Sequence, residues 1–213
     1  MVKFIILLIL LIGTLDALII YIVFRNISEK RKEVYRLFEL HGFRMISKED
    51  VLWKKLSKAS QTMLNIRMTL PNFNFFVEVA EGVCFFEIVV SSRYNSWTYY
   101  GLIENVKGKV GNLGNFSIRK RNPVSRLFSR TDDTFYRDFK VTPEGFIDRL
   151  SNSVILKDFI KTYGEINIAK NEEYFVIYQV FQKKLKTNDL VHKAQELLEK
   201  RENILRLLGV DDF

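Results

Sequence analysis

The chain has 213 residues, of which 47% are hydrophobic and 14% aromatic, and its formal net charge is +8. This apolar content is enough for a packed core, so the composition excludes an intrinsically disordered protein. The single cysteine, Cys84, excludes an internal disulfide and any zinc site built from several cysteines.

Residues 4–24 form an apolar run that only Gly13, Thr14 and Asp16 interrupt. A helix rises about 1.5 Å per residue, so a run of this length spans the roughly 30 Å hydrocarbon core of a bilayer. A cleaved signal peptide is the alternative, but its apolar stretch is shorter and a small-residue cleavage site follows it. The run therefore predicts an uncleaved, single-pass transmembrane helix at residues 1–25.

Basic residues are concentrated on the carboxy-terminal side of this run. Lys3 precedes it, and the basic residues that follow closely are Arg25, Lys30, Arg31, Lys32 and Arg36. Lys and Arg favour the cytoplasmic side of a membrane. We therefore expect a protein of the cell membrane that contacts the lipid bilayer and whose carboxy-terminal domain is cytoplasmic.

Asp16 lies midway along the run, where an ionised acid costs about 2.5–3.5 kcal/mol in a bilayer. Gly13, Asp16 and Ala17 share one helical face, and Gly13 and Ala17 form a small-x-x-x-small pair that lets a second helix approach closely. This spacing predicts a helix-packing face in a homo-oligomer or against a partner transmembrane helix. The alternative is that the flanking apolar residues drive insertion and Asp16 is tolerated.

Beyond the run, the apolar spacing is first helical and then alternating. Residues 26–60 show helical spacing in two segments, 29–41 and 47–59, which predicts juxtamembrane helices. Phe73, Phe75, Val77 and Val79 then alternate with other residues, as in an antiparallel meander sheet. Strands are also predicted over 135–141 and in a hairpin over 165–181.

Two helices are predicted in the second half of the chain. One begins at Thr142-Pro143, a typical helix start, and runs to residue 163. The other is a long amphipathic helix over 187–209. The fold class is therefore α+β: a transmembrane helix and then a soluble domain at 61–213, with a meander sheet and packing helices. This domain is either one unit or two subdomains, 61–121 and 131–213.

The segment TDDTFYRDFKV, residues 131–141, resembles a motif of uncharacterised prokaryotic single-pass membrane-anchored proteins, Thr-Gly-Asp-x-x-Phe-Asp-x-x-Phe-x-Val. Thr131, Asp133, Phe139 and Val141 match this motif directly. Asp132 replaces its Gly, and Phe135-Tyr136 is one residue out of step. The resemblance in the order of elements covers about residues 115–209. It implies a fold and a membrane location, and it implies no activity.

A basic segment precedes this motif. Its cations are Arg119, Lys120, Arg121, Arg126 and Arg130. They predict a patch that binds anionic lipid headgroups or another polyanion, with Leu127 and Phe128 exposed between them. A solvated loop is the alternative. Nucleic acid is not an expected partner, because the sheet's aromatic residues alternate inward and leave no stacking surface.

Motifs for chemistry are absent from the sequence. It has no phosphate-binding glycine motif and no Cys/His set with metal spacing, so we expect no cofactor and no metal. Asp132 and Asp133 form either a carboxylate pair for acid–base work or a turn or N-cap before a strand. We expect a non-catalytic interaction or scaffolding module at the cytoplasmic membrane face. The alternative is a membrane-tethered enzyme with its site near Asp132 and Asp133, and a nucleic-acid-binding module is third.

Overall fold

A computed structural model describes residues 2–66, 72–91, 95–107, 113–129, 131–163 and 165–210, with the side chains of residues 2–11, 24 and 27 left out of the description. The elements in chain order are α1 (Val2–Leu40), β1 (Arg44–Ile46), α2 (Val51–Leu64), β2 (Asn72–Ala80), β3 (Val83–Ser91), β4 (Ser96–Asn105), β5 (Phe116–Lys120), α3 (Pro123–Leu127), α4 (Thr134–Asp138), β6 (Phe139–Thr142), η1 (Ile147–Arg149, a 3-10 turn), α5 (Ser153–Thr162), β7 (Asn167–Lys170), β8 (Tyr174–Phe181) and α6 (Thr187–Leu207).

The strands form one antiparallel sheet in the order β1-β2-β3-β4-β8-β7-β5-β6. The first four strands follow the chain as a meander. The last strand, β8, then pairs with β4 along its whole length, from Thr98 opposite Phe181 to Asn105 opposite Tyr174. Strands from both stretches that the sequence offered as separate subdomains therefore belong to the same sheet.

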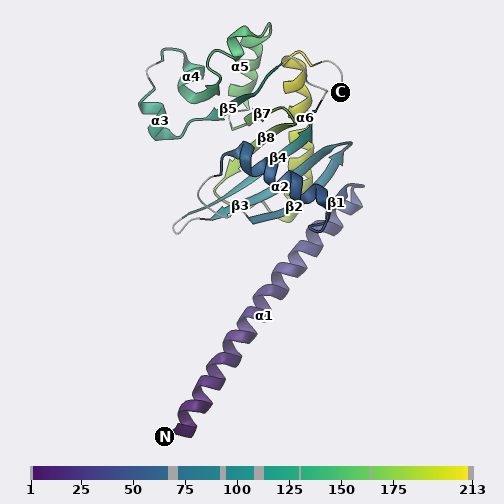
Figure 1. Cartoon of the computed structure of the whole chain (residues 1–213), viewed down its shortest axis with the longest axis vertical. Coiled ribbons are helices and arrows are strands. Elements are labelled where there is room, and N and C mark those ends of the chain that lie inside the picture. Colours follow the sequence, from purple (N-terminus) through teal and green to yellow (C-terminus); the bar gives the residue numbers. More distant parts are fainter. Residues whose placement is uncertain are drawn as a thin grey trace.

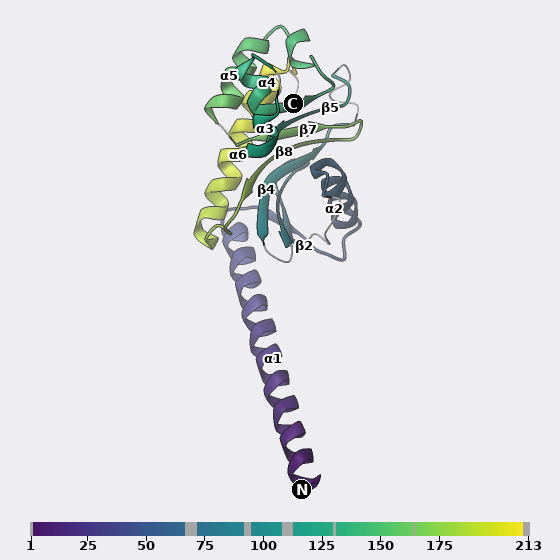
Figure 2. The same ribbon diagram turned by 90° about the vertical axis from the view of Figure 1, so that its left-hand side faces the viewer.

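Helices cover both faces of this sheet, with α2 on one face and α6 on the other (Figures 1 and 2). Alternate residues of β3 consequently face different cores. Phe85 points into the core that contains Leu197 of α6, and Phe86 points into the core that contains Trp53 of α2. Burial on both faces explains why β3 reads as a nearly continuous apolar run. The observed class is α+β.

Helix α1 is continuous and projects away from the sheet (Figure 1). Its carboxy-terminal end anchors it to the domain through Phe38, which is fully buried. The Phe38 ring centroid lies 5.6 Å from that of Phe75 and 5.9 Å from that of Phe85. Towards the amino terminus, the side chains described over residues 12–23 are exposed.

The predicted transmembrane anchor at residues 1–25 is not supported and must be corrected. Among the described residues, no helix combines the length and the apolar character needed to cross a membrane. Helix α1 also contains a charged stretch that begins at Arg25 and includes Glu29, Lys30, Arg31 and Lys32. The single-pass topology, the cell-membrane location and the cytoplasmic orientation were all derived from this anchor, and they are corrected with it.

A buried ion pair joins α6 to the centre of the sheet. Arg201 of α6 donates to Glu104 of β4 through both Nε and Nη2, and the Nε–Oε2 distance is 2.8 Å. The side chains of Arg201 and Glu104 are 7% and 3% exposed. Removing one partner of such a pair leaves the other charge desolvated and uncompensated.

We therefore expect Arg201→Met to lower the free energy of unfolding by about 3–5 kcal/mol, measured by urea denaturation of the full chain. Adding Glu104→Leu to this variant should restore part of the loss, because the buried charge is then gone. The control is Arg206→Met, which changes an exposed arginine of the same helix. Equal losses of unfolding free energy in Arg201→Met and Arg206→Met would contradict the stabilising role of the Arg201–Glu104 ion pair.

Gly101 lies where β4 pairs with β8, opposite Tyr178. A Cβ atom at this position would lie 2.5 Å from Cζ of Phe86 and 2.6 Å from the carbonyl oxygen of Ile177. Gly→Ala at a strand position without such contacts stabilises a protein by about 0.5–1 kcal/mol. The close approach at Gly101 instead predicts that Gly101→Ala destabilises the protein.

Gly101→Ala should lower the free energy of unfolding by about 1–3 kcal/mol, as overpacked cores do. Thermal and urea unfolding measure the change. Gly13→Ala is the matched control, since no atom lies within 4 Å of a Cβ at Gly13 and no loss is expected. A stabilised Gly101→Ala variant would show that the β4–β8 contact is looser than described.

Candidate functional site

Two short helices, α3 and α4, form an arm beside the β5–β6 edge of the sheet (Figure 1). Their local sequences explain why they form. Asn122 caps α3 by accepting from the Ser125 amide at 2.7 Å, and Pro123 fills the first helical position. Asp133 caps α4 by accepting from the Phe135 amide at 2.7 Å. The arm is residues 121–129 and 131–138.

The arm is fixed to the domain at one end and exposes apolar side chains at the other. Phe135 is fully buried and stacks on Phe139, with ring centroids 5.0 Å apart. In contrast, Val124 is 63% exposed, Leu127 83% and Phe128 79%. Large apolar side chains this exposed on one short helix suggest a surface that contacts something else.

Two hollows border α3. The first has a volume of about 620 Å³ and is lined by Arg121, Phe128, Ser129, Thr131, Tyr136, Lys140, Val141, Glu144, Gly145 and Asp148. The second has a volume of about 450 Å³ and is lined by Pro123, Arg126, Leu127 and Arg137. The first hollow therefore combines two cations and two carboxylates with Phe128, the C-cap of α3, and the second combines two cations with Leu127 of α3.

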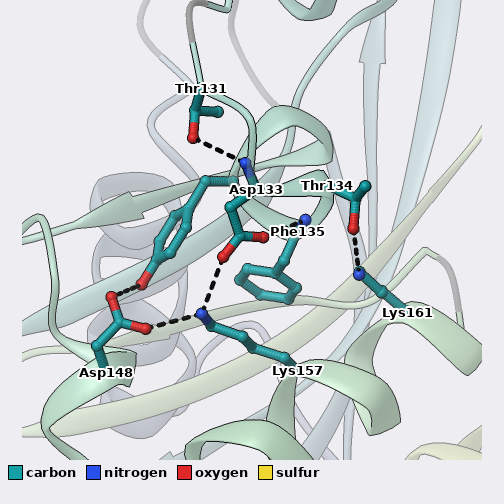
Figure 3. A network of polar contacts seen from close by, with 8 residues as sticks. Thr131, Asp133, Thr134, Phe135, Asp148, Lys157 and Lys161 are labelled. Carbon is teal, nitrogen blue, oxygen red and sulfur yellow. Dashed lines mark hydrogen bonds and ion pairs between the residues drawn. The ribbon is translucent and has the colours of Figure 1, made fainter.

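A network of charged groups supports the first hollow (Figure 3). Lys157 of α5 bridges two carboxylates: its Nζ atom lies 3.2 Å from Asp133 Oδ2 and 2.7 Å from Asp148 Oδ1. The Tyr136 hydroxyl donates to Asp148 at 2.6 Å, and Lys157 Nζ lies 4.6 Å from the centroid of the Tyr136 ring. The network thus ties α4 and η1 to α5.

The network fixes the protonation states of its members. The bonds from Lys157 and Tyr136 lower the pKa of Asp148. Partial burial opposes ionisation of Asp133, but the bonds from the Phe135 amide and Lys157 outweigh it and lower the pKa. Burial and the neighbouring Asp148 raise the pKa of Tyr136. A general acid or base works best with a pKa near the operating pH, and these shifts move every one of the three away from neutrality.

Asp133 and Asp132, the predicted carboxylate pair, are used differently. Asp133 is an N-cap and an ion-pair partner, although it precedes a helix where the sequence suggested a strand. Asp132 is exposed and does not line either hollow. The two acids therefore do not converge on one cavity, as a catalytic carboxylate pair would.

The four described cations of the predicted polyanion patch have different contacts. Arg119 donates to the Met63 carbonyl oxygen at 2.7 Å, and Lys120 pairs with Glu165 at 3.5 Å. Arg121 lines the first hollow and Arg126 the second, whereas Arg130 lies outside the described residues.

Sequence reasoning missed Arg137 and Lys140, which complete the two hollows. Lys140 had a usable signal, because it alternates with the buried Phe139 and Val141 and must therefore point away from their core.

Gly13, Asp16 and Ala17 lie on the projecting part of α1, where all three are exposed. No atom lies within 4 Å of a Cβ placed at Gly13. The described elements of this chain therefore do not cover this face of α1. The packing role of these residues against a second helix stays a prediction.

The described residues hold no cluster of three His, Cys, Asp or Glu side chains that could bind a metal ion. Cys84 is buried, and burial raises the pKa of its thiol to about 12, so it is a core residue with little thiolate.

Searches of protein-family models, curated proteins and solved structures found no match to this chain.

The network makes the stability of the arm depend on pH. Because the pKa of Asp148 is lowered by folding, its contribution is present above the unfolded pKa of about 3.9 and is lost as the pH falls through the folded value. The Asp148 side chain is 51% exposed, so we expect Asp148→Asn to cost no more than about 1 kcal/mol at neutral pH.

Thermal unfolding at a series of pH values measures this effect. The difference between the wild type and Asp148→Asn should be constant near neutral pH and should vanish in strong acid. Asp158→Asn is the matched control, because Asp158 is an exposed acid beside Lys157 on α5. A difference for Asp148→Asn that persists at low pH would contradict the ion-pair explanation.

Proposed function

We propose that this protein is a non-catalytic interaction module that binds an acidic segment of a partner protein across α3. The observation that carries the proposal is the arrangement of exposed Leu127 and Phe128 beside the two hollows. Apolar anchors surrounded by cations suit a segment that carries acidic and apolar residues together.

The charges at the hollows support an acidic partner. Among the described residues, no carboxylate forms an ion pair with Arg121, Arg137 or Lys140. Three acids nearby are engaged, since Asp133 and Asp148 pair with Lys157 and Asp138 pairs with Arg126 at 2.6 Å, whereas Glu144 of the first hollow forms no ion pair with a described residue. The chain also carries a net charge of +8, which attracts acidic partners over a longer range.

Two other functions receive less support. Catalysis near Asp132 and Asp133 would need titrating groups that converge on a cavity, and the network instead stabilises fixed charges. Binding of single-stranded nucleic acid would need aromatic side chains on the surface for base stacking. The sheet residues Phe75, Phe85 and Tyr100 are at most 3% exposed, and Phe128, which is 79% exposed, is a single ring and not a row of stacking positions.

The proposal is tested with the full chain and two short fluorescent peptides. Both carry the same apolar residues, and one has Glu where the other has Lys. We expect the acidic peptide to bind more tightly, with an affinity that falls as salt is added, because salt screens exposed charges. Fluorescence anisotropy measures the dissociation constants.

Replacing both Leu127 and Phe128 by Ser should weaken binding of the acidic peptide by about tenfold or more, as loss of central apolar anchors does. The matched control replaces Val154 and Ile155 by Ser, because these exposed apolar residues lie on α5, away from the hollows. Tighter binding of the basic peptide, of single-stranded nucleic acid or of anionic vesicles would overturn the proposal, as would equal effects of the two double variants.

A further inference from the structure

The structure assigns to the first hollow a site for an oxyanion, a carboxylate or phosphate group of the bound segment, held between Arg121 and Lys140. This inference rests on the proposed function, which it deepens by naming the chemical group that enters one hollow. It comes from how the two cations are oriented and from what the other polar groups of the hollow already bind.

Arg121 is held in place by the arm itself. Its Nε atom donates to the Tyr136 carbonyl oxygen at 3.1 Å, and its backbone amide donates to the Asp138 carbonyl oxygen at 2.8 Å. A guanidinium group has five N–H donors in a rigid plane, and this bond uses the one on Nε. The terminal nitrogens then provide the paired donors that suit carboxylate and phosphate oxygens.

Lys140 reaches the same hollow from the neighbouring strand. It pairs with Arg119 across the β5–β6 ladder, so its side chain lies on the same face of the sheet as that of Arg119, and Arg121 follows directly after the end of β5. Lys140 is exposed, and no described acid forms an ion pair with it. The two cations can therefore approach one anion from adjacent elements.

The remaining polar residues of the hollow include two hydroxyl residues and two acids. Ser129 and Thr131 line it with the cations, and their hydroxyl groups can donate to an oxyanion, although Thr131 Oγ1 also accepts from the Asp133 amide at 3.3 Å. Asp148 lines the hollow too, but its charge is engaged by Lys157 and Tyr136. Glu144 also lines the hollow, is exposed and has no ion-pair partner among the described residues. Glu144 should therefore repel an anion held by Arg121 and Lys140.

This arrangement predicts changes of opposite sign at two exposed residues. Lys140→Gln should weaken anion binding by about tenfold, because a charge-assisted hydrogen bond is lost. Glu144→Gln should strengthen it severalfold by removing the repulsion. Arg121→Gln should abolish measurable binding, but it also removes the bond to Tyr136, so the two exposed variants carry the test.

The experiment titrates the full chain with inorganic phosphate and, separately, with acetate, at constant ionic strength. Isothermal titration calorimetry gives the affinities for the wild type and for each variant. Lys120→Gln is the matched control: Lys120 precedes Arg121 in the chain but pairs with Glu165, and it does not line the hollow, so no change is expected. Tighter binding of phosphate identifies a phosphorylated segment, and tighter binding of acetate identifies a Glu- or Asp-rich one.

The inference is overturned if neither anion binds, or if Lys140→Gln and Glu144→Gln leave the affinities unchanged. These failures are distinct from a failure of the proposed function. An acidic peptide that binds through Leu127 and Phe128 while both anions fail would keep the interaction module and remove the oxyanion site. Phosphate that binds as predicted while the peptide fails would keep the site and remove the peptide partner.

Discussion

The pairing of β4 with β8 is the constraint on which the rest of the structure depends. It joins the meander of β1–β4 to the strands β5–β8 in one sheet, through residues far apart in the chain. The pairing needs Gly101, since Phe86, Ile177 and Tyr178 leave no room for a side chain at that position. It also places Glu104 beneath Arg201, so that α6 is attached directly to the joined strands. One sheet with two covered faces is the result.

The arm is a consequence of this order of strands. Because β8 lies next to β4, the strands β7, β5 and β6 are added outward, and β6 becomes an edge. The residues between β5 and β6 therefore lie at the periphery, where α3 can expose Leu127 and Phe128 without opening a core. Lys157 then holds Asp133 and Asp148 together across three elements. The network holds residues that line the first hollow in place. The lowered pKa values of Asp133 and Asp148 keep both carboxylates ionised near neutral pH, which suits a structural role better than proton transfer.

Where the sequence analysis failed, local pattern and tertiary position disagreed. Residues 135–141 alternate in a way that fits a strand, but Asp133 caps a helical turn, so α4 precedes β6. Thr142-Pro143 resembles a helix start, yet Thr142 ends β6 and the helical residues begin later, at η1 and α5. The length and composition of the apolar run at residues 4–24 predict a membrane span, whereas no helix in the described part of the chain has the length and apolar character of a span.

The sequence by itself determined the α+β class, the meander of alternating apolar residues and the long amphipathic helix that became α6, because these follow from periods of two and 3.6 residues. It also located Arg121, Arg126, Leu127 and Phe128 in one basic and apolar segment. The tertiary structure decided which of these cations act together. Arg119 and Lys120 are used within the domain, and Arg137 and Lys140 join Arg121 and Arg126 at the hollows. Strand pairing and helix packing set these neighbours, and contacts between residues distant in the chain leave no local periodic signal.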